Sequence, residues 1–191
     1  VLGPGGAHEL LMSSRGVRNP ERDIVAALRA LAVEAGKHGY AAILPASVSL
    51  PVDSLRLWVR AVRVARDEQS AELQRGRARD EAIILGANSE GPAISHSRKG
   101  AHDPMVLIAG TELLRALEDR SDDWSALRLV TVAPELKGAE DLIRYLAKRK
   151  IVVSVGHSSA TYEQADAAWA AGATSTTHLC NGMDPFHHRT P

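Results

Sequence analysis

The chain has 191 residues, of which 45% are apolar and 24% are charged, a composition typical of a globular domain with a core of its own. Lysine plus arginine and aspartate plus glutamate both total 23, so the overall charge gives no reason to expect nucleic acid or a membrane surface as a partner. No apolar run reaches the roughly 20 residues of a membrane span, and no signal peptide is visible. The single cysteine, Cys180, excludes a disulfide within the chain and fits a reducing compartment, so we expect a cytoplasmic protein.

The sequence alternates helical and strand-like segments. In chain order, we predict a loop over 1–17, a helix that begins at Asn19-Pro20-Glu21 and ends at Gly36 or Gly39, a strand over 40–44, a helix opened by Pro51, a loop over 76–80, a strand over 82–85, a long loop over 93–104, a helix around Leu113, a strand over 127–132, a helix around Leu142, and a strand over 151–155. This alternation indicates a parallel sheet covered by helices. A doubly wound sheet and a (β/α) barrel both fit it. Because a complete eight-stranded barrel runs to about 250 residues, a barrel here is expected to be incomplete.

Arginine is dense between residues 60 and 79, but acidic residues are interspersed with it. Asp67, Glu68 and Glu72 lie within the segment, and Asp80 follows it. We therefore interpret this segment as a solvated helix face and loop rather than as a basic patch.

Residues 151–183 carry the most specific pattern. The apolar, β-branched run 151–155 is typical of a strand buried on both faces, and it ends in Gly156-His157. A helix follows, with a capping box between Thr161 and Gln164, an apolar face of Tyr162, Ala165, Ala168 and Trp169, and a stop at Gly172. A strand is then predicted over 173–179, ending near His178. The unit therefore presents one histidine at the carboxyl end of each strand, where parallel α/β folds place their chemistry.

His157 and His178 are candidate metal ligands, because neutral imidazole is a common ligand of zinc and related ions. Either histidine alone is as well explained by a hydrogen bond to a backbone carbonyl, but equivalent positions in successive units favour a metal. Glu90 is expected at the end of another strand, in Glu90-Gly-Pro. A carboxylate and two imidazoles form a ligand set of catalytic zinc, although they suit iron and manganese equally well.

Cys180 has two interpretations. If the strand continues past His178, the two side chains share a face and the thiolate could reach the metal. A lone cysteine is more often a small buried apolar residue, and we favour that interpretation.

Several short motifs together resemble the N-acetylglucosamine-6-phosphate deacetylases of the amidohydrolase superfamily. In family order, they are Ser89-Glu-Gly-Pro92, Lys99-Gly-Ala-His102, Val132-Ala-Pro-Glu135, Val155-Gly-His-Ser158, Ala160-Thr-Tyr162 and Thr177-His-Leu-Cys-Asn-Gly-Met183, followed by Arg189. The resemblance implies a TIM-type (β/α) barrel that is incomplete in this chain, with about five to six of eight βα units. Residues 1–191 would be the central part of a single catalytic domain, with no second domain visible.

The resemblance also implies an activity, the hydrolysis of the acetamido group of N-acetylglucosamine-6-phosphate to glucosamine-6-phosphate and acetate. Because an incomplete barrel exposes unpaired strand edges, we expect the chain to associate, with a homodimer favoured. The implied site holds one divalent ion, with zinc favoured over iron or manganese. The implied residue roles are metal binding for Glu90, His157 and His178, donation to the acetamido carbonyl for His102, sugar-phosphate contact for Asn181 and Gly182, and phosphate pairing for Arg189.

The chain also departs from the family pattern. Leu2 stands where the superfamily usually has the second histidine of a His-x-His motif, so a second metal is not expected. By the resemblance, the general acid/base is an aspartate on a late strand past the point that corresponds to Pro191, and a further phosphate-binding histidine lies beyond the same point. Two other hypotheses therefore stay open, a non-catalytic remnant of the fold and an amidohydrolase that acts on another N-acyl compound.

Overall fold

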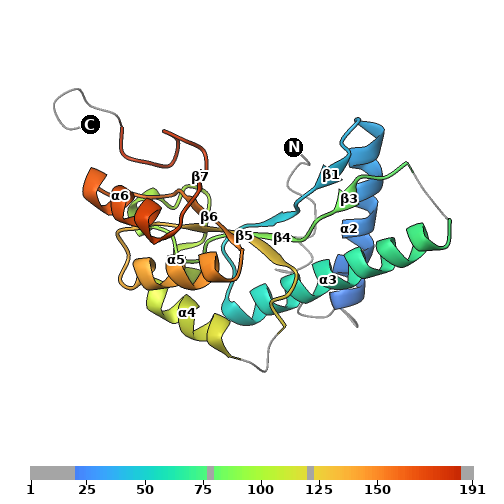
Figure 1. Ribbon diagram of the computed structural model, residues 1–191, viewed down its shortest axis with the longest axis horizontal. Helices are drawn as coiled ribbons and strands as arrows, with labels where there is room; N and C mark the ends of the chain where they lie inside the picture. Colours follow the sequence, from blue (N-terminus) through green and yellow to red (C-terminus); the bar gives the residue numbers. More distant parts are fainter. Residues whose placement is uncertain (1–19, 77–79, 120–122, 186–191) are drawn as a thin grey trace. The chain divides into compact units, whose positions relative to one another are not determined.

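The computed structural model describes residues 20–76, 80–119 and 123–185 (Figure 1). The chain folds into two compact units. The first unit contains the described residues up to 47, together with 53–88 and 123–127. The second unit contains 48–52 and the described residues of 89–122 and 128–191.

The first unit is built on two long helices and short strands. Its elements are α2 (Pro20–Lys37), β1 (Ala42–Ile43), β2 (Ala46–Ser47), α3 (Val52–Gln74) and β3 (Ile83–Ile84). β1 and β3 pair in parallel, with Ala42 opposite Ile83. β1 is shorter than the strand predicted over 40–44, and a second strand, β2, follows Pro45.

In the first unit, the side chain of Gln69 forms hydrogen bonds to the backbone of β3 and the residue before it, as a neighbouring strand would do. Its side chain is 1% exposed, its Nε2 donates to the Ala82 carbonyl at 2.9 Å, and its Oε1 accepts from the Ile84 N–H at 2.8 Å. We expect Gln69→Leu to lower the free energy of unfolding by about 1–3 kcal/mol, because both buried backbone groups lose their partner. Urea unfolding measures this difference. Gln74→Leu, at an exposed position of the same helix, is the control, and an equal loss in both variants would contradict the explanation.

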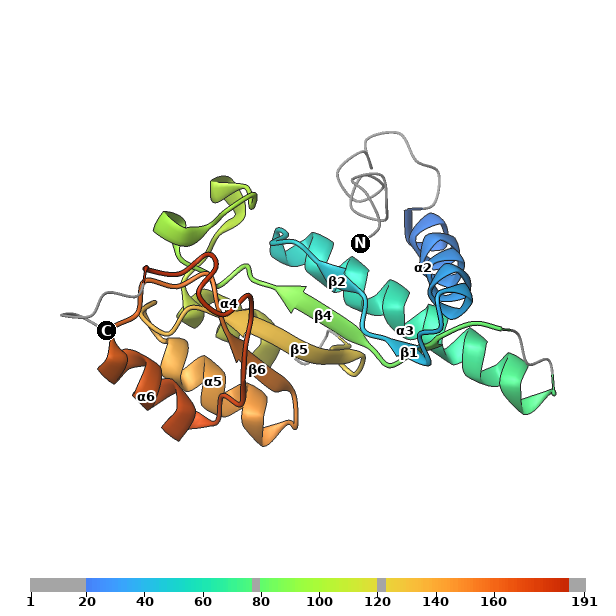
Figure 2. The same ribbon diagram turned by 90° about the horizontal axis from the view of Figure 1, so that it is seen from above.

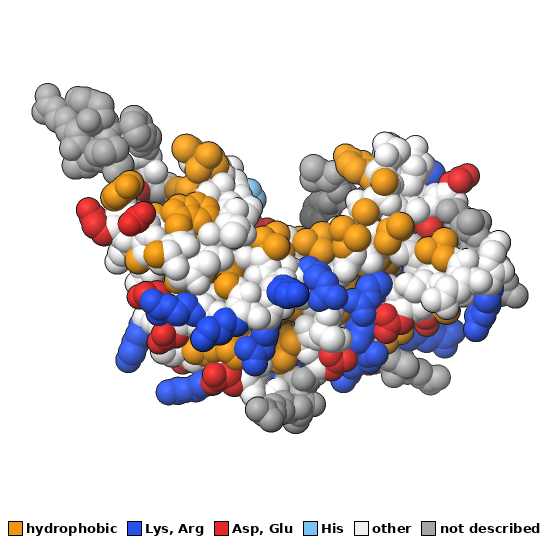
Figure 3. Space-filling view, viewed as in Figure 1, with side chains coloured by type: hydrophobic (Ala, Val, Ile, Leu, Met, Phe, Trp, Pro, Cys, Tyr) orange, Lys and Arg blue, Asp and Glu red, His pale blue; other side chains and the backbone are white. Residues whose placement is uncertain are grey.

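The arginines of α3 form a solvated face, as predicted. Arg56 pairs with Asp53 at 2.7 Å, Arg60 with Glu21 at 2.9 Å, and Arg63 with Asp123 at 2.9 Å. In the space-filling view, basic side chains predominate over the region of this helix, with acidic side chains among them (Figure 3). Exposed pairs of this kind contribute about 0–1 kcal/mol each, and they leave no uniform basic surface on α3.

The second unit contains the parallel strands that end at the candidate site. Its elements are β4 (Ala87–Glu90), which begins in the first unit, α4 (Gly110–Glu118), β5 (Leu127–Val132), α5 (Ala139–Lys148), β6 (Val152–Val155), α6 (Tyr162–Ala171) and β7 (Ser175–Thr176). The strands are adjacent in the order β4-β5-β6-β7. β5 and β6 pair in parallel with Val132 opposite Val155, and β6 and β7 with Val155 opposite Thr176.

Helices α4, α5 and α6 form a row beside these strands (Figure 2). α5 buries Leu142, Ile143 and Leu146 completely, and each such side chain contributes roughly 1.5–3 kcal/mol through its burial. Gly172 ends α6 in a left-handed conformation, with φ of 116°, and a Cβ there would lie 2.6 Å from the Ala147 Cβ. The predicted C-terminal stop at Gly172 is therefore confirmed, and close packing of α6 against α5 explains why this residue is glycine.

Three details of the second unit differ from the sequence-based expectations. β4 is a separate strand that was not predicted, although Glu90 does end a strand as expected. The strand predicted over 173–179 stops at Thr176, because the backbone turns into positive φ at His178 (45°) and Cys180 (65°). Tyr162 and Trp169 were assigned to an apolar face of α6, but they are 73% and 42% exposed. Within the predicted face, Ala168 is buried as expected, and the other buried residue of α6 is Ala171, which was not assigned to that face.

The architecture is α/β with parallel strand pairs, in agreement with the alternation in the sequence. Within the described ranges, no helix combines the length and the apolar character that crossing a membrane requires.

Candidate functional site

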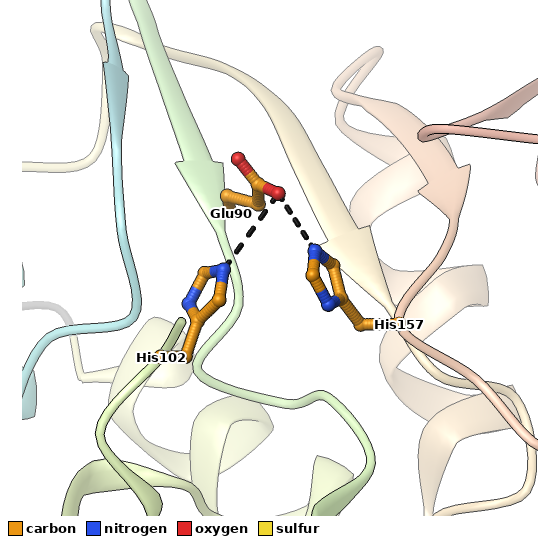
Figure 4. A group of neighbouring side chains, drawn as sticks. All are labelled: Glu90, His102 and His157. Carbon is orange, nitrogen blue, oxygen red and sulfur yellow. Dashed lines mark hydrogen bonds and ion pairs between the residues drawn. The ribbon is translucent and has the colours of Figure 1, made fainter. Parts of the chain in front are cut away.

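The candidate ligands lie at the carboxyl ends of three strands in the second unit. Glu90 is the last residue of β4, and His157 and His178 follow the ends of β6 and β7 by two residues each. His102 comes from the loop after β4. The rings of His102 and His157 point toward the same carboxylate oxygen of Glu90 (Figure 4).

Three donor atoms converge most closely. Glu90 Oε1 lies 2.7 Å from His178 Nε2 and 2.8 Å from His157 Nε2, and the two Nε2 atoms are 3.2 Å apart. Ligands at the roughly 2.0 Å bond lengths of zinc lie ~3.3 Å apart in a tetrahedral site. The three atoms therefore form a triangle slightly smaller than one face of such a tetrahedron. His102 Nε2 is more distant, at 3.7 Å from the same oxygen.

A hydrogen bond to a backbone carbonyl determines the tautomer of the His157 ring. Its Nδ1 lies 2.8 Å from the Arg98 backbone carbonyl, which can only accept, so Nδ1 carries the proton. In the neutral ring, Nε2 then has a free lone pair that faces the Glu90 carboxylate at 2.8 Å. Two acceptors in contact require a cation or a proton between them. The residues therefore fit a divalent metal ion, and a ligand histidine whose other nitrogen donates to a backbone carbonyl is the usual arrangement.

His102 has the opposite tautomer. Its Nδ1 accepts from the backbone N–H of Ser49 at 2.9 Å, and a backbone N–H can only donate. The neutral His102 ring therefore carries its proton on Nε2, and this N–H points toward Glu90. Although Glu90, His102 and His157 are close enough to form a metal-binding group, a protonated Nε2 cannot be a ligand. The geometry makes His102 a hydrogen-bond donor next to the site.

The site favours an ionised Glu90. The pKa of its carboxyl is lowered to about 2, first by the His102 ring and then, against the opposing effect of burial, by His178 and His157. Because the pKa is depressed in the folded protein, the ionised carboxylate stabilises the fold above about pH 4.5, and this contribution is lost as the pH falls toward 2.

The backbone around His157 is strained and closely packed. His157 has φ of 49°, which costs a residue with a Cβ on the order of 1 kcal/mol or more. A Cβ on Gly156 would lie 2.7 Å from Thr177 Cβ, so only glycine allows the two segments to approach. Below them, Thr177 Oγ1 bonds to Thr131 Oγ1 at 2.9 Å and to Ser154 Oγ at 2.6 Å. These partly buried hydroxyl contacts fix the residue next to His178.

The predicted substrate-binding residues are only partly described. Gly182 lies beside the site, since its carbonyl accepts from the Ser158 N–H at 3.1 Å and a Cβ on it would lie 3.3 Å from His157 Nδ1. Asn181 is exposed in the same segment. Arg189 lies outside the described residues. Cys180 is an exposed free thiol, so the interpretation as a small buried residue is wrong, and the end of β7 at Thr176 removes the reason to place it beside His178.

Two residues near the site carry no role in the sequence-based prediction. Ser49 selects the tautomer of His102 and also donates through its Oγ to the Glu90 carbonyl at 3.0 Å. Nothing in its neighbourhood in the sequence signals this function. Glu135 contacts the two residues that follow His157. Its position shortly after the carboxyl end of β5, the same end of a strand at which the candidate ligands lie, is a signal that could have identified it.

Comparison with known proteins gives a consistent result. The chain is 36% identical over 167 residues to an N-acetylgalactosamine-6-phosphate deacetylase of Escherichia coli O157:H7, which covers 84% of this chain and 40% of that protein. It is 38% identical over 159 residues to the N-acetylglucosamine-6-phosphate deacetylase of Vibrio furnissii, which covers 80% of this chain and 36% of that protein. No family model matches the chain.

Among solved structures, N-acetyl-D-glucosamine-6-phosphate deacetylase from Mycobacterium smegmatis matches with a TM-score of 0.66 and 32% identity, over 98% of this chain and 43% of that one. An aspartate-to-alanine mutant of the same enzyme has been solved in complex with N-acetyl-D-glucosamine-6-phosphate. The predicted resemblance to these deacetylases is therefore confirmed. The chain spans about two fifths of the length of the relatives that it matches.

Proposed function

We propose that this chain, which resembles N-acetylglucosamine-6-phosphate deacetylases over most of its length, forms the central part of the catalytic domain of such an enzyme. The protein would hydrolyse the acetamido group of N-acetylglucosamine-6-phosphate to glucosamine-6-phosphate and acetate. The observation that supports this most strongly is the convergence of Glu90, His157 and His178 within 3.2 Å beside the N–H donor of His102. We also propose that residues 1–191 contribute five to six βα units of a (β/α) barrel.

Glu90, His157 and His178 would hold one divalent metal ion, and zinc suits this set of one oxygen and two nitrogen donors. When bound, the ion supplies Lewis-acid polarisation of the substrate carbonyl and a water of lowered pKa. Glu90 is already ionised before a metal binds, because its pKa is lowered to about 2. Metal binding therefore does not require Glu90 to lose a proton.

His102 would stabilise the transition state. Its Nε2–H donates to the acetamido oxygen as negative charge develops there. The Ser49 N–H holds Nδ1 as the acceptor, so the proton stays on the nitrogen that faces the substrate. By the resemblance, the proton transfer to the leaving amine belongs to an aspartate on a later strand.

Asn181, Gly182 and Arg189 would bind the phosphate end of the substrate. The backbone of Gly182 lies against His157, which would bring a phosphate-binding segment within reach of the metal ligands. The guanidinium group of Arg189 would pair with phosphate oxygens through two parallel hydrogen bonds. We further propose a homodimer and a cytoplasmic location. The unpaired strand edges of an incomplete barrel support the first, and the free thiol of Cys180 supports the second.

Acetate release by the purified protein that carries this chain tests the proposal. We expect turnover of N-acetylglucosamine-6-phosphate with a kcat/KM roughly 10–100-fold above that for unphosphorylated N-acetylglucosamine, because charge-assisted bonds to the phosphate contribute about 1.5–3 kcal/mol. Equal turnover of both sugars would favour an enzyme for another N-acyl compound. No acetate from metal-loaded protein would favour a non-catalytic remnant. N-acetylgalactosamine-6-phosphate should be assayed in parallel, because one relative is named for that sugar.

A further inference from the structure

Glu135 is an acidic side chain beside the candidate ligands that has no role in the mechanism above. It follows the end of β5 by three residues and is partly buried. Its Oε2 accepts from Ser158 Oγ at 2.7 Å, and its Oε1 accepts from the Ser159 N–H at 2.8 Å and from Ser159 Oγ at 3.2 Å. All of these donors belong to the two residues that directly follow His157.

The contacts that the described part of the chain gives Glu135 are these hydrogen bonds to Ser158 and Ser159. The carboxylate is therefore used as an acceptor for one short loop, and a charged acceptor makes stronger hydrogen bonds than a neutral one. Glu140 provides a contrast within the same part of the chain. It lies in the first turn of α5, and its carboxylate pairs with Arg144 on the helix surface.

The loop that Glu135 contacts includes His157, whose backbone is strained, and Ser158, which makes hydrogen bonds to three other residues. His157 has φ of 49°, and such a conformation persists only where the surrounding contacts determine it. Ser158 is bound on three sides. Its Oγ donates to Glu135 and accepts from the Ala160 N–H at 2.9 Å, while its own N–H donates to the Gly182 carbonyl at 3.1 Å. Through Ser158, Glu135 therefore restrains the segment of Gly182 and the residue that follows His157, whose own carbonyl accepts from the Ser95 N–H at 2.8 Å.

We propose that Glu135 is a positioning residue for the metal site. By fixing Ser158 and Ser159, it holds His157 in the left-handed conformation that directs Nε2 toward Glu90 and His178. Without it, residues 157–159 relax toward a more populated conformation and the imidazole leaves the point of convergence. The inference rests on the proposed function, since it assumes that these three residues bind the metal.

The test compares three variants of the full-length protein, Glu135→Ala, Glu135→Gln and the control Glu140→Ala. Zinc affinity is measured by competition with a chromophoric chelator. We expect Glu135→Ala to bind zinc about 10–100-fold more weakly, the usual cost of losing a group that orients a ligand. Glu135→Gln should lose less, because its amide oxygen can still accept from the Ser159 N–H. Glu140→Ala should keep the wild-type affinity.

Two further measurements separate positioning from a general loss of structure. The absorption spectrum of the cobalt-substituted protein reports ligand geometry, and it should change in Glu135→Ala but not in Glu140→Ala. In the metal-free protein, hydrogen exchange at the Ser159 amide should accelerate in Glu135→Ala. If that variant does not fold, Glu135→Gln carries the test, since it keeps the shape of the side chain.

Wild-type affinity and a wild-type cobalt spectrum in both Glu135 variants would overturn the inference and leave the proposed function intact. Failure of the wild-type protein itself to bind zinc would overturn both. These outcomes are distinguishable because the wild-type titration is made first.

Discussion

Replacement of His157 with alanine should abolish metal retention. His157 is buried, its side chain being 7% exposed, and its Nε2 lies 2.8 Å from Glu90 Oε1 and 3.2 Å from His178 Nε2. Removal of this ring leaves one carboxylate and one imidazole that is 42% exposed, too few protein ligands for a catalytic metal site. The loss should exceed the roughly 10–100-fold effect of removing an orienting partner, and hydrolysis should fall with it.

Elemental analysis after dialysis against a weak chelator measures this outcome. Wild-type protein should retain about one equivalent of metal, which is the expectation from the three-ligand set. His38→Ala is a matched control, because His38 is an exposed histidine at the end of α2 whose nearest ionic partner is Glu34 at 3.2 Å. Metal content near one equivalent in His157→Ala would remove His157 from the ligand set and with it the central observation behind the proposed function.

Much of the architecture followed from local sequence signals. The β-branched run over 151–155 and the capping box of Thr161 and Gln164 lie within one turn or strand, and both appear in the structure. The position of His157 at a strand end was predicted for the same reason, because an apolar, β-branched strand is recognisable from its composition. Glu90 was expected at a strand end as well, but the strand that it ends, β4, has no such composition and was not predicted.

The parts of the site that were missed depend on contacts between distant residues. The hydrogen bond from the Ser49 N–H to His102 joins residues 53 positions apart, and the one from the Ser159 N–H to Glu135 joins residues 24 positions apart. No periodicity in the sequence encodes such pairs. The predicted strand over 173–179 was too long for a similar reason. The sequence of residues 173–179 suits a strand, but the chain has to turn at His178 for its ring to reach Glu90.

A second substitution distinguishes donors from ligands within the site. His102→Ala should lower kcat by about 10²–10³, the usual effect of removing one donor to a developing oxyanion, while metal content stays near that of the wild type. The basis is the tautomer, since the Ser49 N–H at 2.9 Å occupies the only lone pair of the neutral ring. Nitrogen-15 NMR of the histidine rings should find Nδ1 of His102 unprotonated and Nδ1 of His157 protonated.

The competing assignment makes an opposite prediction for the same variant. If Glu90, His102 and His157 were the ligands, as their proximity permits, His102→Ala would lose the metal and His178→Ala would keep it. In our assignment, His178→Ala loses the metal and His102→Ala keeps it. The reason is that His178 Nε2 lies 2.7 Å from Glu90 Oε1, whereas His102 Nε2 lies 3.7 Å from it. The pair of variants therefore tests the ligand set without any assumption about the substrate. Since metal binding and catalysis are measured separately, a drop in kcat with full metal content supports the role of His102 as a hydrogen-bond donor and contradicts a role as a ligand.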